Sequence, residues 1–166
     1  DVRVDGSLLV SLVEGLRDGA DVVSAAPHPE VGPTLATRTV RGLLVQSHHS
    51  FRVLDVMAAG PRAMCGKVLA LSEDAQNELV KLQNCIGEDL ELSLVMASQG
   101  RKVALASSVA NVPQSAGLPM REVVARFTRW MQVLRAHRPA LFPTVPVFFA
   151  PTPVLMVAAA VLGEQW

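Results

Sequence analysis

Apolar residues recur at helical spacing in several segments of the chain. The clearest segment is 119–134, whose apolar positions follow the i, i+3, i+4, i+7 rule: Met120, Val123, Val124, Phe127, Trp130, Met131 and Leu134. Comparable patterns predict further helices over 8–16, 39–57, 72–82 and 89–98. Gly19 and Gly100 follow two of these segments and are expected to end their helices.

Short β-type runs lie between the predicted helices. They cover 2–4, 21–26, 67–71 and 103–106, whereas the proline-rich run 27–33 predicts a loop. Strands that alternate with helices indicate an α/β layered sheet, expected to be mixed in strand direction.

The C-terminal part changes abruptly from basic to apolar. Residues 121–138 carry five arginines against the single acid Glu122, whereas 141–163 contain no charged residue. This order predicts an amphipathic interfacial helix over 119–138, followed by a spanning or re-entrant membrane segment over 142–163. The four prolines make a straight helix unfavourable in the first half of that segment, and a buried hairpin in a soluble core is the alternative.

Composition narrows the functional classes. With 166 residues, 50% of them hydrophobic, the chain is long enough for one core, and its net charge of zero gives no reason to expect nucleic-acid binding. Cys65 and Cys85 stand alone and are expected to be small buried residues in a reducing compartment. Both ends look cut, so we expect a part of a longer protein.

Glu88 and Asp89 form an acidic pair that opens the predicted helix 89–98. A carboxylate within hydrogen-bond reach of a hydroxyl acts as a general base, so Asp89 is a candidate base and Glu88 a candidate orienting group. The alternative is an acidic helix start that only complements the helix dipole.

The run Arg126-Phe127-Thr128-Arg129-Trp130 places two cations and an indole along one flank of a helix. Guanidinium groups suit a diphosphate because they are permanently charged and present a planar fork of donors. Trp130 would offer an apolar wall to a sugar or an acceptor. The alternative is a membrane-surface helix with its arginines toward lipid headgroups.

Taken together and in this order, these motifs resemble the ceramide glucosyltransferase-like family of inverting nucleotide-sugar glycosyltransferases, which includes bacterial hopanoid-associated members. The resemblance implies a GT-A-type α/β sheet flanked by helices, of which this chain holds the C-terminal, acceptor-side part over 1–118. It also implies that Asp89 is the base and that Arg126, Arg129 and Trp130 border the diphosphate and the acceptor. The first βαβ half of such a domain is missing from this sequence.

The same resemblance implies roles for three further residues. Asp1, in the run Asp1-Val2-Arg3-Val4, looks like the last acid of an Asp-x-Asp motif that holds Mg²⁺ or Mn²⁺ on the diphosphate. Gly66 and Lys67 resemble a Gly-Lys segment near the acceptor, where glycine would permit close backbone approach. A structural turn with a solvated lysine is an equally good interpretation of that segment.

The expected function is transfer of a glucose or N-acetylglucosamine type sugar from a UDP-sugar to a lipid such as ceramide or a hopanoid. The expected location is a membrane, with the active site on its cytoplasmic side. Two alternatives stay open: a non-catalytic membrane-surface module and a processive polysaccharide synthase.

Overall fold

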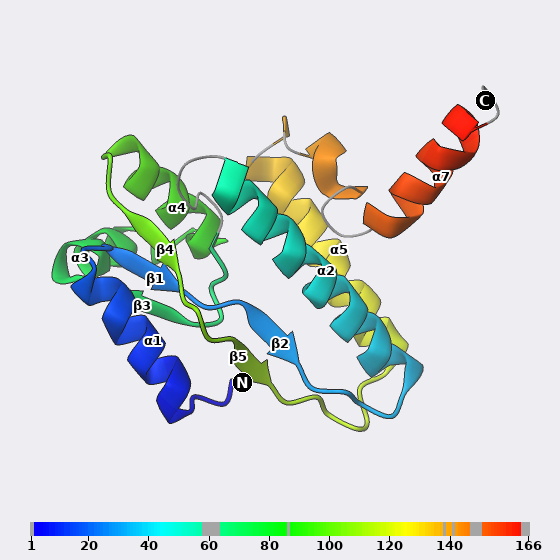
Figure 1. Ribbon diagram of the computed structural model, residues 1–166, viewed down its shortest axis with the longest axis horizontal. Coiled ribbons are helices and arrows are strands. Elements are labelled where there is room, and N and C mark those ends of the chain that lie inside the picture. The colour runs from blue at the N-terminus through cyan, green and yellow to red at the C-terminus, as the bar shows by residue number, and fades with distance from the viewer. Residues whose placement is uncertain are drawn as a thin grey trace.

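The computed structural model describes residues 2–57, 64–85, 87–137, 139–140, 142–146 and 151–163. Its elements are α1 (Gly6–Arg17), β1 (Val22–Ser24), β2 (Pro27–Pro29), α2 (Leu35–Met57), β3 (Leu69–Leu71), α3 (Glu73–Lys81), α4 (Glu88–Ser98), β4 (Val103–Leu105), β5 (Ala110–Val112), α5 (Met120–His137), the 3-10 turn η1 (Phe142–Thr144) and α7 (Pro151–Gly163). Figure 1 shows the strands at the centre, with helices on either side.

The main sheet has three strands in the order β3-β1-β4. The central strand β1 runs antiparallel to β3 and parallel to β4. Along the chain, β2 follows β1 and β5 follows β4, and β2 and β5 form a separate parallel pair. The expectation of a mixed sheet flanked by helices, as in part of a GT-A domain, is therefore confirmed.

Alternation along β1 separates two apolar cores. Val23 is fully buried toward α1 and its cluster includes Leu8 and Leu12. Val22 is fully buried on the opposite face, in a cluster with Leu92 and Met96 of α4. Because successive side chains of a strand point to opposite faces, Ser24 lies on the same face as Val22.

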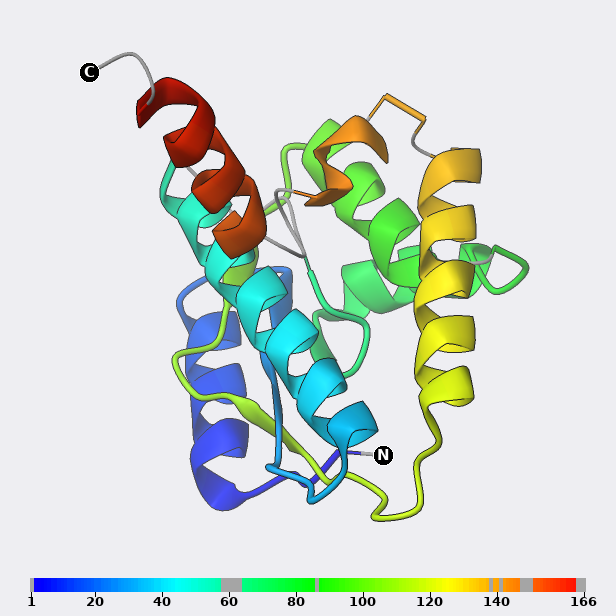
Figure 2. The same ribbon diagram turned by 90° about the vertical axis from the view of Figure 1, so that its right-hand side faces the viewer.

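A third core joins α5 to α2. Val40 and Leu44 of α2 are buried with Val123 of α5, and Phe127 and Trp130 pack against them. Figure 2 shows α2 and α5 on the same side of the molecule, with α4 behind and between them. The long amphipathic helix predicted from the apolar period over 119–134 is therefore confirmed, and its apolar face covers α2.

Side-chain caps and glycines define the ends of several helices. Asp5 and Ser72 cap α1 and α3 by accepting the N–H groups of Leu8 and Ala75. Gly19 and Gly100 adopt φ angles of +80° and +67°, the left-handed conformation that glycine tolerates at helix ends.

The strand predictions were partly wrong. The run 27–33, predicted as a loop, contains β2, and β5 was missed. Proline fits β2 because the flanking bonds to β5 run from Ala110 N–H to Ala26 O and from Glu30 N–H to Val112 O. The prolines occupy the alternate positions, whose nitrogens point away from β5. The strand expected at 2–4 is reduced to one bridge between Arg3 and Asn111.

The apolar segment 142–163 does not form one long helix where it is described. It contains the short turn η1 and the separate helix α7 of 13 residues, consistent with its proline content. Across the described ranges, none of the helices is both long and apolar enough to cross a bilayer.

An ion-pair cluster ties the residues that lead into β1 and β4 to α3. Arg101 donates to Asp21 at 2.9 Å and to Asp74 at 2.8 Å, and Asp21 also accepts the Lys102 N–H. Partial burial opposes ionisation of Asp21, but these hydrogen bonds outweigh it and lower its pKa below the ordinary value.

We predict that Asp21→Asn lowers the free energy of unfolding at pH 7 by about 1–2 kcal/mol, since it loses charge-assisted hydrogen bonds. Because the folded-state pKa is depressed, this contribution is present above the unfolded pKa and is lost as the pH falls through the folded pKa. Thermal melts of both proteins from pH 7 to pH 3 should therefore converge in acid. Asp74→Asn is the control: its side chain is 65% exposed, so its effect should be smaller. A constant difference across the pH range would contradict the assignment.

Candidate active site

The start of α4 meets two other parts of the fold. Asp89 contacts the segment that leads into β3, and Gly87 contacts α5. Gly87 precedes the helix with φ +90°. A Cβ added at Gly87 would lie 2.9 Å from Val133 Cγ1, so the start of α4 lies directly against α5. Val133 lies one helical turn beyond Trp130, so the helix that Gly87 contacts is the one that carries the basic motif.

Two backbone N–H groups hold the Asp89 carboxylate. Gly66 N–H donates to Oδ2 at 3.0 Å, and Leu90 N–H donates to Oδ1 at 2.9 Å. Each carboxylate oxygen has two lone pairs, so each retains capacity to accept another hydrogen bond. The side chain is half-buried rather than enclosed, and a hydroxyl can approach it.

Gly66 makes this arrangement possible by its lack of a side chain. A Cβ at position 66 would lie 3.0 Å from Asp89 Oδ2 and 3.1 Å from Asp89 Cβ. The structure therefore brings together Gly66 and Asp89, two residues that sequence reasoning had assigned to one site. Lys67 follows Gly66 and is half-buried, whereas Glu88 is exposed on the first turn of α4.

Cys65 lies immediately before this contact. Burial raises the pKa of its thiol, and the nearby charge of Asp89 acts in the same direction, although a hydrogen bond from the Lys67 N–H opposes both. The thiol is therefore neutral at physiological pH. Cys65 and Cys85 are both half-buried, so the expectation that they are buried residues was wrong in degree.

The three motif residues on α5 have different surroundings. Trp130 is half-buried in the α2–α5 core and meets Phe127 edge to face, with ring centroids 4.9 Å apart. Arg126 is half-buried and Arg129 is exposed. Within the part of the chain that is described, neither arginine forms a salt bridge with an acid. Trp130 thus stabilises the helix that presents the two cations.

The described residues do not provide a metal site by themselves. No group of three or more His, Cys, Asp or Glu side chains among them is arranged to hold a metal ion. Asp1, the predicted ligand of the divalent cation, lies outside the described residues. The metal requirement stays a prediction.

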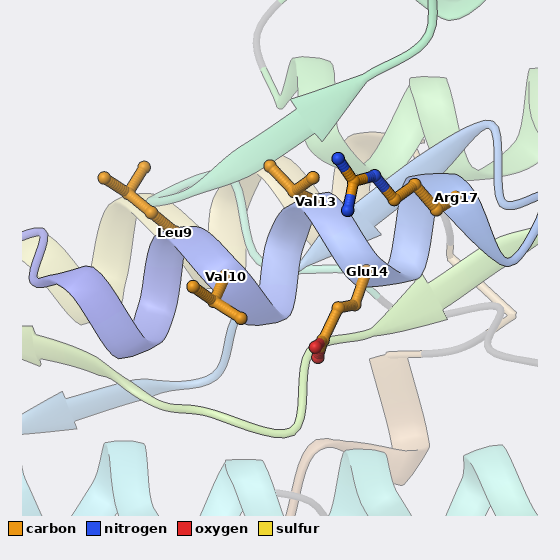
Figure 3. A pocket seen from close by; sticks show the side chains of 5 residues that line it. All are labelled: Leu9, Val10, Val13, Glu14 and Arg17. Carbon is orange, nitrogen blue, oxygen red and sulfur yellow. The ribbon is translucent and has the colours of Figure 1, made fainter.

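A hollow elsewhere on the surface contains none of the predicted site residues. It lies on the outer face of α1, where Leu9, Val10 and Val13 are exposed beside Glu14 and Arg17 (Figure 3). The candidate site is therefore defined by the contacts around Asp89 and not by this hollow.

Sequence reasoning missed one residue of the site. Ser24, at the end of β1, exchanges hydrogen bonds with the backbone of Cys65. The only sequence signal was a hydroxyl that ends an otherwise apolar strand, and many buried serines share that pattern.

The junction of α4 and α5 can be tested by filling Gly87. Gly87→Ala combines an unfavourable positive φ with a 2.9 Å clash against Val133, so we expect it to cost about 2–4 kcal/mol of unfolding free energy. Gly100→Ala is the matched control, because Gly100 shares the positive φ but has nothing within 4 Å of the added Cβ. It should cost about 1–2 kcal/mol. Equal losses in chemical denaturation would show that α4 and α5 are not in tight contact.

Comparison with known proteins identifies the family to which this site belongs. The family model described as Glycosyl transferase family group 2 matches residues 1–163. No curated protein matched the chain significantly, and no solved structure did so either. An enzyme of this family moves a sugar from a nucleotide-sugar donor to an acceptor. The match covers nearly the whole chain, and the chain therefore belongs to Glycosyl transferase family group 2 and is a glycosyltransferase.

Proposed function

We propose that this chain is the acceptor-side part of an inverting glycosyltransferase that moves a glucose or N-acetylglucosamine type sugar from a UDP-sugar to a lipid acceptor. A ceramide or a hopanoid-type lipid is the acceptor class that the motifs favour. The observation that carries the proposal is the Asp89 carboxylate, which Gly66 N–H holds at 3.0 Å. Gly87, just before the same helix, contacts α5, which carries Arg126 and Arg129.

Asp89 acts as the general base in this proposal. The acceptor hydroxyl donates to a carboxylate oxygen, and its proton moves to Asp89 as the hydroxyl oxygen attacks the anomeric carbon. The bond between that carbon and the diphosphate oxygen breaks, and UDP leaves with the bonding electrons. Attack from the face opposite the leaving group inverts the anomeric configuration.

The arginines of α5 bind the donor diphosphate. Their guanidinium groups are free of acidic partners within the described residues, and the two lie one turn apart on the same helix. Lys67 beside Gly66 adds a third cation near the acceptor. Trp130 is half-buried, so its indole offers only its remaining exposed part as a wall for sugar or lipid.

A membrane surface is the proposed location, with the site on the cytoplasmic side. Arg121, Arg129 and Arg135 are exposed on α5. Helix α7 exposes apolar side chains, among them Leu155 at 67% and Met156 at 69%. Basic and apolar surfaces close together in the chain suit contact with lipid headgroups and acyl chains. Mg²⁺ or Mn²⁺, with Asp1 among its ligands, is the proposed cofactor.

The central test is Asp89→Asn in the full-length protein, in detergent with Mg²⁺. Labelled UDP-glucose and UDP-N-acetylglucosamine are supplied separately with a membrane lipid extract, and label in the lipid phase is counted. We expect Asp89→Asn to lower turnover by about 10²–10⁴-fold, because the proton acceptor is lost. Glu88→Gln should lose less, since Glu88 is exposed and only orients the site. EDTA should abolish transfer by the unmodified protein.

Three outcomes would contradict parts of the proposal. Full activity of Asp89→Asn would remove Asp89 as the base. Membrane binding without donor binding or transfer would favour the membrane-surface module. Products that carry many sugars instead of one would favour a processive synthase.

Gly66→Ala tests the positioning of the base without touching its carboxylate. The added Cβ would press on Asp89 at 3.0–3.2 Å, so the carboxylate must shift. A displacement of this kind should lower kcat by about 10–100-fold. Gly6→Ala, where nothing lies within 4 Å, should leave kcat unchanged. An equal kcat for both variants would show that the close approach of Gly66 does not position the base.

A further inference from the structure

Ser24 connects the central strand of the sheet to the candidate base. It is the last residue of β1 and is fully buried, on the same face as Val22. A buried hydroxyl costs free energy unless it is hydrogen-bonded. Ser24 satisfies its hydroxyl entirely on the backbone of Cys65: Oγ accepts the Cys65 N–H at 2.8 Å and donates to the Cys65 carbonyl at 3.3 Å.

The Cys65 carbonyl belongs to the same peptide unit as the Gly66 N–H. A trans peptide is planar, and its C=O and N–H point in opposite directions. The structure contains no cis peptide bond in the described residues. A hydroxyl that fixes the carbonyl end therefore also fixes the direction of the N–H end, which donates to Asp89 Oδ2 at 3.0 Å.

We infer that Ser24 is a positioning residue for the base: it orients the Cys65–Gly66 peptide so that its N–H holds the Asp89 carboxylate. The bond from Ser24 to the Cys65 carbonyl and the bond from Gly66 N–H to Asp89 share one peptide group, so each polarises that group for the other. This inference rests on the proposed function of Asp89 and adds a residue that does not touch the substrate.

The sheet makes Ser24 a rigid starting point. Its own carbonyl accepts the Ala106 N–H at 2.8 Å, and the next N–H, of Ala25, donates to Val68 O at 3.2 Å. Ser24 also pairs in register with Leu69 on one side and Leu105 on the other. A positioning group held on both sides by strands transmits little motion to the group it supports.

The experiment measures kcat and the donor KM of Ser24→Ala in the full-length protein. Because Ala cannot make either bond to Cys65, we expect kcat to fall by about 10–100-fold while the donor KM stays within a factor of about two. Ser24→Thr keeps the hydroxyl and should recover most of kcat. Unchanged kcat in a folded Ser24→Ala protein would overturn the inference.

Ser11→Ala controls for the loss of a buried hydroxyl. Ser11 is 6% exposed, and its Oγ accepts the N–H of Ser108 at 3.2 Å in a loop that follows β4. Its loss should lower thermal stability without lowering kcat. An equal fall of kcat in Ser11→Ala and Ser24→Ala would show a general loss of stability and overturn the positioning role.

A double variant separates this inference from the proposed function. If Ser24 acts through Asp89, Ser24→Ala should not lower kcat further in an Asp89→Asn background. If the two substitutions lower kcat independently, so that their effects multiply, the inference is overturned. If Asp89→Asn alone retains turnover, the proposed function itself fails.

Should Ser24→Ala not fold, Ser24→Cys replaces the hydroxyl by a weaker donor of similar shape, and its kcat should lie between those of Ser24→Thr and Asp89→Asn. Full kcat in Ser24→Cys would count against the role.

Discussion

The hydrogen bond from Gly66 N–H to Asp89 Oδ2 is the contact on which the candidate site depends. It joins a segment that leads into β3 to the first turn of α4, across 23 positions of sequence. Regular secondary structure does not supply this bond: Gly66 precedes its strand, and Asp89 lies in the first turn of its helix. The contact therefore exists only if the sheet holds the loop and the packing of α4 holds the carboxylate at the same time.

Both supports follow from the distribution of apolar side chains. Val22 and Val23 send consecutive side chains into different cores, which fixes β1 between α1 and α4. Leu92 and Met96, buried one and two turns after Asp89, anchor α4 to that sheet. The small residues Gly66 and Gly87 then allow two close approaches, one to the carboxylate and one to α5. Apolar burial supplies the stability, and the glycines decide how closely the polar groups meet.

The sequence was a good guide where a pattern repeats. The helical period over 119–134, the cap at Ser72 and the acidic start of α4 all correspond to elements of the structure. Strands were harder to predict because each has only three residues, too few to show an alternating pattern. At β2, two prolines favoured a loop, and only the pairing with β5 reveals that their nitrogens face away from the ladder. That information lies in the partner strand, not in the local sequence.

In the candidate site, too, the sequence indicates which residue types are present but not which residues they contact. The sequence identifies Asp89 as a carboxylate at a helix start and Arg129 as a cation on an amphipathic helix, because these properties are local. It does not indicate that Ser24, 41 positions before Cys65, holds that residue's backbone. A serine hydroxyl forms such bonds with any backbone that the fold brings near, so no spacing in the sequence predicts its partner. A general base is therefore recognisable from its own chemistry, whereas the groups that orient it depend on how the strands are paired.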